Sequence, residues 1–148
     1  MQEKKILIAS DHGGFELKEL LKSYLQKQGY NVFDYGTNST ASVNYPDYAK
    51  LVVEGLKEKK GDCGILICTS GIGMSIAANR YSFIRAALVS NKDLAHMARA
   101  HNDANVLVLG AKYIKPDIAK ECVNEFLTTA FEGGRHCARV EALERMGK

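Results

Sequence analysis

Short apolar segments alternate with longer segments of helical periodicity along the whole of this 148-residue chain. Residues 64–68 have the length and apolar character of a buried strand. Residues 15–28 repeat leucines at helical spacing and end before Gly29, which favours a helix end. Strands that alternate with helices over short connections predict a parallel sheet with helices on both faces. The other strands are expected at 5–9, 31–35, 85–89 and 105–109, and the other helices at 46–60, 71–80, 91–101, 116–131 and 135–146.

This pattern predicts an α/β fold of the three-layer α/β/α, Rossmann-like class, with a five-stranded parallel sheet and an additional C-terminal helix. The length suits a single domain over residues 1–148, since the chain has no repeat, linker or low-complexity tract. The net charge of +3 and the scattered basic residues do not favour nucleic-acid binding. No apolar run approaches the roughly 18 residues of a membrane span, and the first residues lead directly into a strand. We therefore expect a cytoplasmic location and no membrane partner.

The four cysteines do not form a recognisable metal or disulfide pattern. None of them makes a C-x-x-C pair, so a zinc ribbon or a thioredoxin-type motif is not supported. A disulfide framework is not expected in a chain with a full-sized core. Cys68 is distinguished from Cys63, Cys122 and Cys137 by its place at the end of a buried strand.

The segment that follows Cys68 predicts an anion-binding turn. Thr69, Ser70, Gly71 and Gly73 separate the strand from a helix-prone segment. In an α/β sheet such a strand delivers its last side chain into the crevice where ligands bind. The glycine turn leaves backbone N–H groups at the next helix start to face an anion. A thiol beside such a site can move protons or form covalent bonds.

Polar side chains in four further segments are expected at the same edge of the sheet as the Cys68 loop. Each also has a plain structural interpretation: Asp11 can cap a helix, His101 is favoured at a helix end, and Arg135 with Arg139 suits a solvated helix face. Cys68 itself has the character of a small core residue. The functional interpretation depends on all five segments lying on one side of the molecule. The residues outside the Cys68 loop are Asp11, His12, His101, Asn102, Lys112, Arg135 and Arg139.

Several known motifs are excluded. A C-x5-R phosphatase loop needs arginine where this chain has Met74, and the dinucleotide fingerprint needs a third glycine where Ile76 stands. No Gly-Lys-Ser/Thr sequence follows the glycines, and no nucleophile elbow of the G-x-S-x-G type is present.

The chain resembles the B-type ribose-5-phosphate isomerases, a family that also holds the allose- and galactose-phosphate isomerases. The resemblance covers nearly the whole chain. It implies interconversion of ribose 5-phosphate and ribulose 5-phosphate, in the non-oxidative pentose phosphate pathway, without a metal or organic cofactor. It also implies a homodimer with each site built from both chains, and the strand order 2-1-3-5-4. The segments that carry it are Asp11-His12-Gly13-Gly14, Tyr45-Pro46-Asp47-Tyr48, residues 64–73, residues 76–79, residues 101–106 and residues 132–136.

By the same resemblance, Cys68 is the base that moves a proton between C1 and C2, which suits a thiolate beside a helix N-terminus. His101, with help from Asp11, opens the sugar ring, and backbone N–H groups of residues 70–73 stabilise the enediolate. Arg135 and Arg139 hold the phosphate. The predicted catalytic residues are Cys68, His101, Ser70 and Asp11, and the predicted substrate-binding residues are Asp11, His12, Tyr45, Thr69, Ser70, Gly71, Ile72, Gly73, Asn102, Lys112, Arg135 and Arg139.

Two residues depart from the family pattern. Ser70 replaces a frequent threonine and Lys112 a frequent arginine, and neither change removes a functional group. Three alternatives stay open: a six-carbon sugar phosphate as substrate, a non-catalytic module that binds a phosphorylated ligand, and a zinc site using Cys68 and His101. The last lacks a third ligand at regular spacing. The sequence also leaves open whether dimers pair into tetramers.

Overall fold

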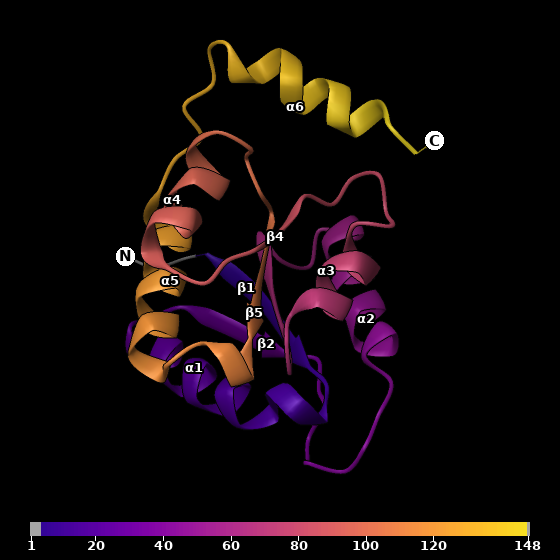
Figure 1. Ribbon diagram of the computed structural model, residues 1–148, viewed down its shortest axis with the longest axis vertical. Helices are drawn as coiled ribbons and strands as arrows, with labels where there is room; N and C mark the ends of the chain where they lie inside the picture. Colours follow the sequence, from indigo (N-terminus) through magenta and orange to yellow (C-terminus); the bar gives the residue numbers. More distant parts are fainter. Residues whose placement is uncertain (1–3, 148) are drawn as a thin grey trace.

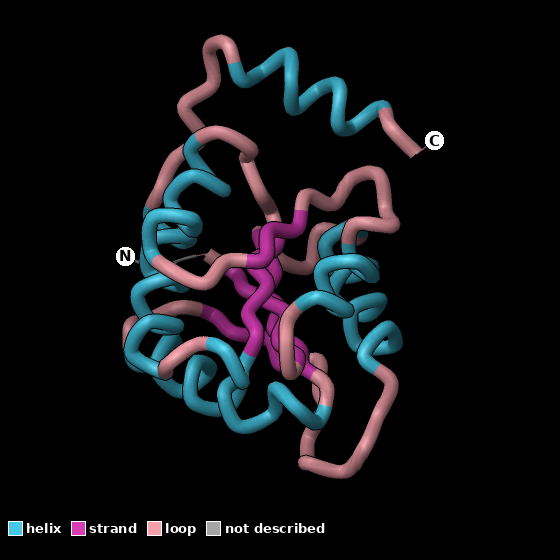
Figure 2. Tube along the Cα trace, in the orientation of Figure 1, coloured by secondary structure: helices cyan, strands magenta, loops and turns pink. Residues whose placement is uncertain are grey.

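A computed structural model describes residues 4–147 of the chain. Its centre is one parallel sheet in the order β2-β1-β3-β5-β4, as predicted. Within it β1 pairs with β2 and β3, and β5 pairs with β3 and β4. The strands run through the middle of the molecule with helices on either side (Figures 1 and 2). They are β1 (Lys5–Ser10), β2 (Asn31–Asp34), β3 (Cys63–Cys68), β4 (Ala86–Leu88) and β5 (Val106–Gly110).

Helices cover both faces of the sheet, as expected for strands joined by helical crossovers. Residues of α1, α4 and α5 pack on one face, and residues of α2 and α3 pack on the other. Two short 3-10 turns follow strands: η1 follows β1 after Asp11, and η2 follows β5 directly. The helical elements are η1 (His12–Gly14), α1 (Phe15–Lys27), α2 (Tyr45–Lys57), α3 (Ile72–Ala78), α4 (Lys92–Ala100), η2 (Ala111–Tyr113), α5 (Pro116–Thr128) and α6 (His136–Arg145).

The central strands supply both cores. Ile6 and Ile8 face the helices α1, α4 and α5, whereas Leu7 and Ala9 face α2 and α3. All four side chains are fully buried. Since successive residues of a strand point to opposite faces, a strand buried on both sides must be apolar throughout. This explains why β1, β3 and β5 appear in the sequence as continuous apolar runs.

Local capping sets most helix boundaries where the sequence predicts them. Gly29 ends the α1 region with φ 93°, and the Asn91 side chain accepts a hydrogen bond from the Leu94 N–H at 2.9 Å. The helix α5 ends at Thr128, three residues before the predicted end, because Thr129 already has extended backbone. Among residues 4–147, no helix is long and apolar enough to cross a membrane.

The helix α6 stands apart from the sheet (Figure 1). Only two of its residues, His136 and Val140, are buried. Its far end is held by an ion pair between Glu144 and the Arg85 guanidinium, which also donates to the Asp103 carbonyl at 2.8 Å. The helix therefore keeps most of its surface exposed within a single chain.

Candidate active site

Cys68 ends β3 at the carboxyl edge of the sheet, as predicted. Its side chain belongs to the core beside α2 and α3, and the residue is only 5% exposed. The Gly71 N–H donates to Cys68 Sγ at 3.2 Å, from a turn that places Gly71 at φ 79°. The turn thus donates a hydrogen bond to the sulfur and also leads into the N-terminus of α3.

The start of α3 presents donors beside the thiol. The Ser70 Oγ accepts from the Ile72 N–H at 3.2 Å, and the first backbone bond of the helix runs from the Ser75 N–H to the Gly71 carbonyl at 3.0 Å. The Gly73 and Met74 N–H groups come before that bond, at the helix end where backbone donors have no intrahelical acceptor. An oxyanion near Cys68 would therefore meet donors already in place.

The turn after β1 packs tightly against the same loop. A Cβ on Gly13 would lie 2.0 Å from Thr69 Oγ1, so glycine is what allows this approach. The buried Asp11 accepts from the Gly14 N–H at 3.2 Å through Oδ1, so it does cap η1. His12 Nδ1 accepts from the Val43 N–H at 3.1 Å, which leaves Nε2 as the protonated nitrogen of a neutral ring.

Two more predicted residues lie against the loop. The Lys112 N–H donates to the Thr69 carbonyl at 3.0 Å, and the Tyr45 ring is so close to Gly73 that a Cβ there would lie 2.6 Å from it. The structure therefore brings ten predicted residues to the carboxyl edge. They are Asp11, His12, Tyr45, Cys68, Thr69, Ser70, Gly71, Ile72, Gly73 and Lys112.

The prediction that all five segments share one side of the molecule is wrong within a single chain. Parallel strands require each crossover helix to run back, so α4 ends at the amino edge of the sheet. The segment after α5 lies beside that end, since the Glu132 N–H donates to the Ala100 carbonyl at 2.9 Å. His101 and Asn102 follow α4, and Asn105 beyond them accepts from the Gly64 N–H near the start of β3, at 3.0 Å. Arg135 and Arg139 follow α5 to the same edge. A zinc site that joins Cys68 to His101 is therefore not formed within one chain.

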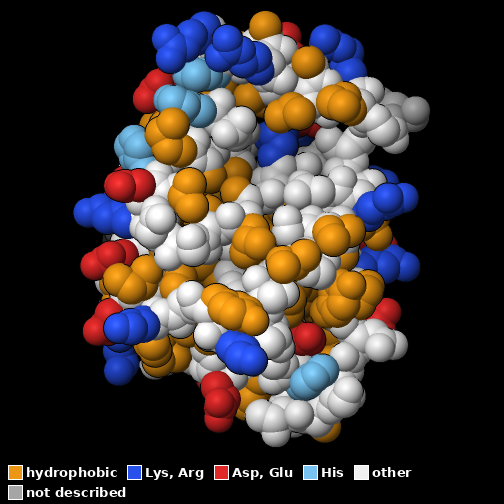
Figure 3. Space-filling view, viewed as in Figure 1, with side chains coloured by type: hydrophobic (Ala, Val, Ile, Leu, Met, Phe, Trp, Pro, Cys, Tyr) orange, Lys and Arg blue, Asp and Glu red, His pale blue; other side chains and the backbone are white. Residues whose placement is uncertain are grey.

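The residues at the amino edge form their own cluster. The His101 and His136 rings stack with centroids 4.2 Å apart and planes 18° from parallel. Glu132 Oε1 lies 3.6 Å from His101 Nε2 and 3.7 Å from His136 Nε2. Burial, then the charges of His101 and Arg135, lower the pKa of His136. Lys and Arg side chains gather over α6 beside histidines (Figure 3).

Sequence reasoning misses the partners in this cluster. From the sequence His136 is expected to be structural or peripheral, and Glu132 belongs to a family motif without a role of its own. The spacing Glu132 to His136, with Gly133 and Gly134 between them, is the available signal, because two left-handed glycines reverse the chain there. Val43, whose N–H orients His12, carries no signal because only its backbone takes part.

Two of the other three thiols, those of Cys63 and Cys122, are buried in the core. Burial raises the pKa of Cys63 to about 12 and that of Cys122 to about 11, so both stay protonated at neutral pH. Cys137 is exposed on α6, and all four cysteines lie among the described residues as free thiols. Cys68 is the cysteine placed beside backbone donors at the carboxyl edge.

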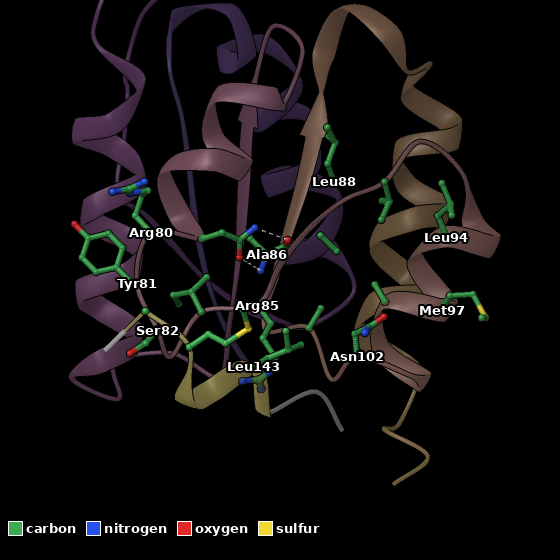
Figure 4. Close-up of a pocket in the computed structure, with 18 residues that line it drawn as sticks. Arg80, Tyr81, Ser82, Arg85, Ala86, Leu88, Leu94, Met97, Asn102 and Leu143 are labelled. Carbon is green, nitrogen blue, oxygen red and sulfur yellow. Dashed lines mark hydrogen bonds between the residues drawn. The ribbon is translucent and has the colours of Figure 1, made fainter. Parts of the chain in front are cut away.

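A cavity lies away from Cys68, beside α6. It has a volume of about 750 Å³ and is bounded by β4, α4 and α6, where Leu88, Leu94 and Leu143 line it together with Asn102 (Figure 4). A second cavity of about 460 Å³ includes Ser70 and Gly110 beside the Cys68 loop. The first cavity thus contains Asn102 but not the Cys68 loop, whereas the second includes Ser70 of that loop.

Comparison with known proteins decides the family. The model of the Ribose/Galactose Isomerase family matches residues 6–143. The chain belongs to this family. Membership of the ribose/galactose isomerase family makes the chain an isomerase, as the resemblance implied. Ribose-5-phosphate isomerase B of Escherichia coli strain K12 is 43% identical over 140 residues, which cover 95% of this chain and 94% of that one.

Solved structures of the family agree with the fold. Ribose 5-phosphate isomerase from Thermotoga maritima is 52% identical with a TM-score of 0.95, and the match covers 97% of this chain and 99% of that one. Ribose-5-phosphate isomerase B from Mycoplasma genitalium, solved with bound ribulose-5-phosphate, is 39% identical with a TM-score of 0.93; the match covers 98% and 97% of the two chains. The predicted Rossmann-like α/β class is confirmed.

Proposed function

We propose that this isomerase interconverts ribose 5-phosphate and ribulose 5-phosphate through an enediolate. The observation that carries the proposal is the Cys68 thiol at the end of β3, which accepts the Gly71 N–H at 3.2 Å beside the first turn of α3. A carbon acid needs a base and a preformed site for the oxyanion it becomes. The family match and the relatives named as ribose-5-phosphate isomerases support this substrate.

The proton transfer would run between Cys68 and two neighbouring carbons. The thiolate takes the C2 proton of the open aldose, and the bond's electron pair moves to form the C1–C2 double bond with an oxyanion at O1. The N–H groups at the start of α3 hold that negative charge. The O2 proton then moves to O1, the electron pair of the C1–C2 double bond takes the proton from the Cys68 thiol at C1, and the C2 carbonyl forms, which completes the ketose and restores the thiolate. Neither step needs a metal or an organic cofactor.

The phosphate and ring-opening groups come, in this proposal, from a second copy of the chain. His101, Asn102, Arg135 and Arg139 lie at the amino edge, so a homodimer must bring them to the partner's Cys68 edge. Partly exposed apolar side chains support such an interface, since contiguous exposed apolar surface marks association sites. Those around the large cavity are Leu88, Leu94, Met97, Leu143 and Met146.

At the Cys68 edge, we assign the remaining groups to the sugar phosphate. The Nε2–H of His12 and the ammonium of Lys112 are donors for the phosphate or hydroxyl groups, while Asp11, beside His12, assists ring opening by the second copy's His101. Residues 1–148 would act as one sugar-phosphate isomerase domain, of which residues 4–147 are described. We further propose a role in the pentose phosphate pathway and a cytoplasmic location.

The test is ribulose 5-phosphate formation from ribose 5-phosphate, in EDTA, by the wild type and Cys68→Ala. Loss of a general base should lower kcat by roughly 10²- to 10⁴-fold. Cys137→Ala, an exposed thiol on α6, is the matched control and should keep full activity. Full activity in Cys68→Ala would remove Cys68 from its role. Binding of ribose 5-phosphate without turnover by the wild type would instead favour a binding module.

A six-carbon substrate is the second outcome to measure. The matching family is described as Ribose/Galactose Isomerase, so both sugar classes belong in one panel. Ribose 5-phosphate should have a higher kcat/KM than allose 6-phosphate or galactose 6-phosphate. The reverse order would keep the isomerase chemistry and change the substrate.

A further inference from the structure

The His101, Glu132 and His136 side chains offer three metal-ligand atoms in one place. The two imidazole nitrogens and one carboxylate oxygen all lie within 4.8 Å of one another. A tetrahedral ion with bonds near 2.1 Å needs its ligand atoms about 3.4 Å apart. The two distances from Glu132 Oε1, 3.6 Å to His101 Nε2 and 3.7 Å to His136 Nε2, are close to that requirement.

The backbone holds the three ligands near each other. The Glu132 N–H donates to the Ala100 carbonyl at 2.9 Å, next to His101 in the chain. The His136 N–H donates to the Gly133 carbonyl at 3.0 Å, across a reversal in which Gly133 and Gly134 have φ of 71° and 56°. The chain segments that carry the ligands are thus joined before any ion binds.

Binding requires the two imidazole side chains to rotate. The stacked imidazole planes are 18° from parallel, so both rings must turn toward Glu132 to direct a lone pair at one ion. The His101 and Glu132 side chains are 29% and 55% exposed, whereas that of His136 is 8% exposed. A buried anchor with two accessible partners leaves the fourth coordination position open to water.

The donor set selects the type of cation. Two imidazoles and one carboxylate suit Zn²⁺ and similar transition-metal dications, whereas Mg²⁺ and Ca²⁺ prefer oxygen ligands. The guanidinium groups of Arg135 and Arg139 oppose a positive charge at His136. Binding should therefore be weaker than in a structural zinc site, and reversible by chelators.

We propose that His101, Glu132 and His136 form an inhibitory binding site for Zn²⁺. The bound ion occupies the imidazole that opens the sugar ring, so it stops the isomerase without taking part in the reaction. Inhibition by zinc rests on the proposed function of His101, whereas zinc binding does not depend on it. The site is a means by which free zinc could regulate the enzyme.

Binding is tested on the full chain after EDTA treatment and desalting, by titrating Zn²⁺ in competition with a chromophoric chelator. One ion per chain is expected, and Glu132→Gln and His136→Asn should each weaken binding by roughly 10- to 100-fold or more. The control is His96→Asn, because His96 pairs with Glu125 at 2.8 Å outside this cluster. Its zinc affinity should match that of the wild type.

The variants distinguish zinc held by this cluster from zinc held elsewhere on the chain. Absence of binding by the wild type, or unchanged binding by the exposed-residue variant Glu132→Gln, would overturn the proposal even if His136→Asn failed to fold. Loss of binding in Cys137→Ala would assign the zinc to the nearby thiol instead and would also overturn it.

Inhibition is measured as the ratio of activities with and without Zn²⁺ for each variant. Wild type should be inhibited, and Glu132→Gln should need a much higher zinc concentration for the same fractional loss. Binding without inhibition would overturn the regulatory proposal and count against His101 as the ring-opening group. Absence of isomerase activity would overturn the proposed function. The chelator competition would still test the metal site, because it does not depend on activity.

Discussion

At the scale of single residues, Gly110 shows how closely two segments of the site approach each other. A Cβ at this position would lie 2.3 Å from the Ser70 carbonyl oxygen, which is backbone and cannot rotate away. Gly110→Ala should therefore displace the Cys68 loop, lower the free energy of unfolding by about 1–3 kcal/mol and reduce kcat/KM. Urea denaturation and steady-state kinetics measure the two effects. Wild-type values for both would show that the loop tolerates the methyl group.

Ser70 provides a second prediction, on hydrogen bonding rather than shape. Its Oγ accepts the Ile72 N–H at 3.2 Å at the start of α3. Ser70→Ala removes this hydrogen bond and should cost about 1 kcal/mol of stability, with a lower kcat because the loop donors lose their fixed positions. Ser70→Thr keeps the hydroxyl and should retain wild-type kinetics. Equal losses in both variants would indicate that space, not the hydroxyl, matters here.

At the scale of elements, an ion network joins α1 to β2. The fully buried Lys18 lies 2.6 Å from Asp34, which also contacts Lys22 at 2.8 Å. Burial alone would raise the pKa of Asp34, but hydrogen bonds from Lys18, Lys22 and the Gly36 N–H outweigh it and lower that pKa. The charged network therefore favours the folded state at neutral pH.

Asp34→Asn should reduce the free energy of unfolding by about 3 kcal/mol or more, because it leaves a buried ammonium without its closest partner. An acid whose pKa is lowered by folding stabilises the protein above its ordinary pKa and loses that contribution as the pH falls through its folded value. The difference from wild type should thus be constant near neutral pH and shrink below about pH 4. Urea denaturation from pH 3 to 8 checks this.

Lys22→Met is the matched control for Asp34→Asn. Its side chain is partly exposed, so its loss should cost only about 1 kcal/mol. A Lys22→Met effect as large as that of Asp34→Asn would place the stabilising interaction on the surface pair rather than on Lys18.

Helix and strand boundaries were predictable where nearby residues in the sequence determine them. The apolar run of β3, Gly29 after α1 and Asn91 before α4 act through their own backbone or nearest neighbours. The end of α3 was not predictable locally, because the Asn79 amide exchanges hydrogen bonds with the backbone of Ala86 at 2.8 and 2.9 Å. Such a contact depends on the folded arrangement of two elements.

The candidate site was predicted only in part for a related reason. Residues directly after β1, β3 and β5 were correctly placed at the carboxyl edge, because strand direction determines where they lie. His101 follows α4, and a helix between parallel strands runs in the opposite direction. Arg135 follows α5, and the chain after α5 is hydrogen-bonded to the end of α4. Their place at the amino edge was thus not predicted from strand direction. The contacts of His101 with Glu132 and His136 depend on the tertiary fold.

At the scale of the whole molecule, the proposed dimer predicts complementation between inactive chains. Cys68→Ala and Arg135→Ala disable different halves of the shared site. When the two variants are mixed and allowed to exchange subunits, each mixed dimer should contain one intact site. Random exchange in a symmetric dimer would restore about a quarter of wild-type activity. Recovery measured after denaturation and refolding together, with each variant alone as control, tests this; no recovery would contradict a shared site.

Because Cys68 and His101 lie at opposite edges of one chain, catalysis should also depend on the protein concentration. In the proposed dimer, each site takes its base from one chain and its phosphate-binding arginines from the other. A separated chain therefore carries two incomplete half-sites. Turnover per chain should then be constant only while the protein concentration exceeds the dissociation constant of the dimer. Below that concentration, dilution alone should abolish activity. Added substrate, which contacts both chains, should favour the dimer and restore activity.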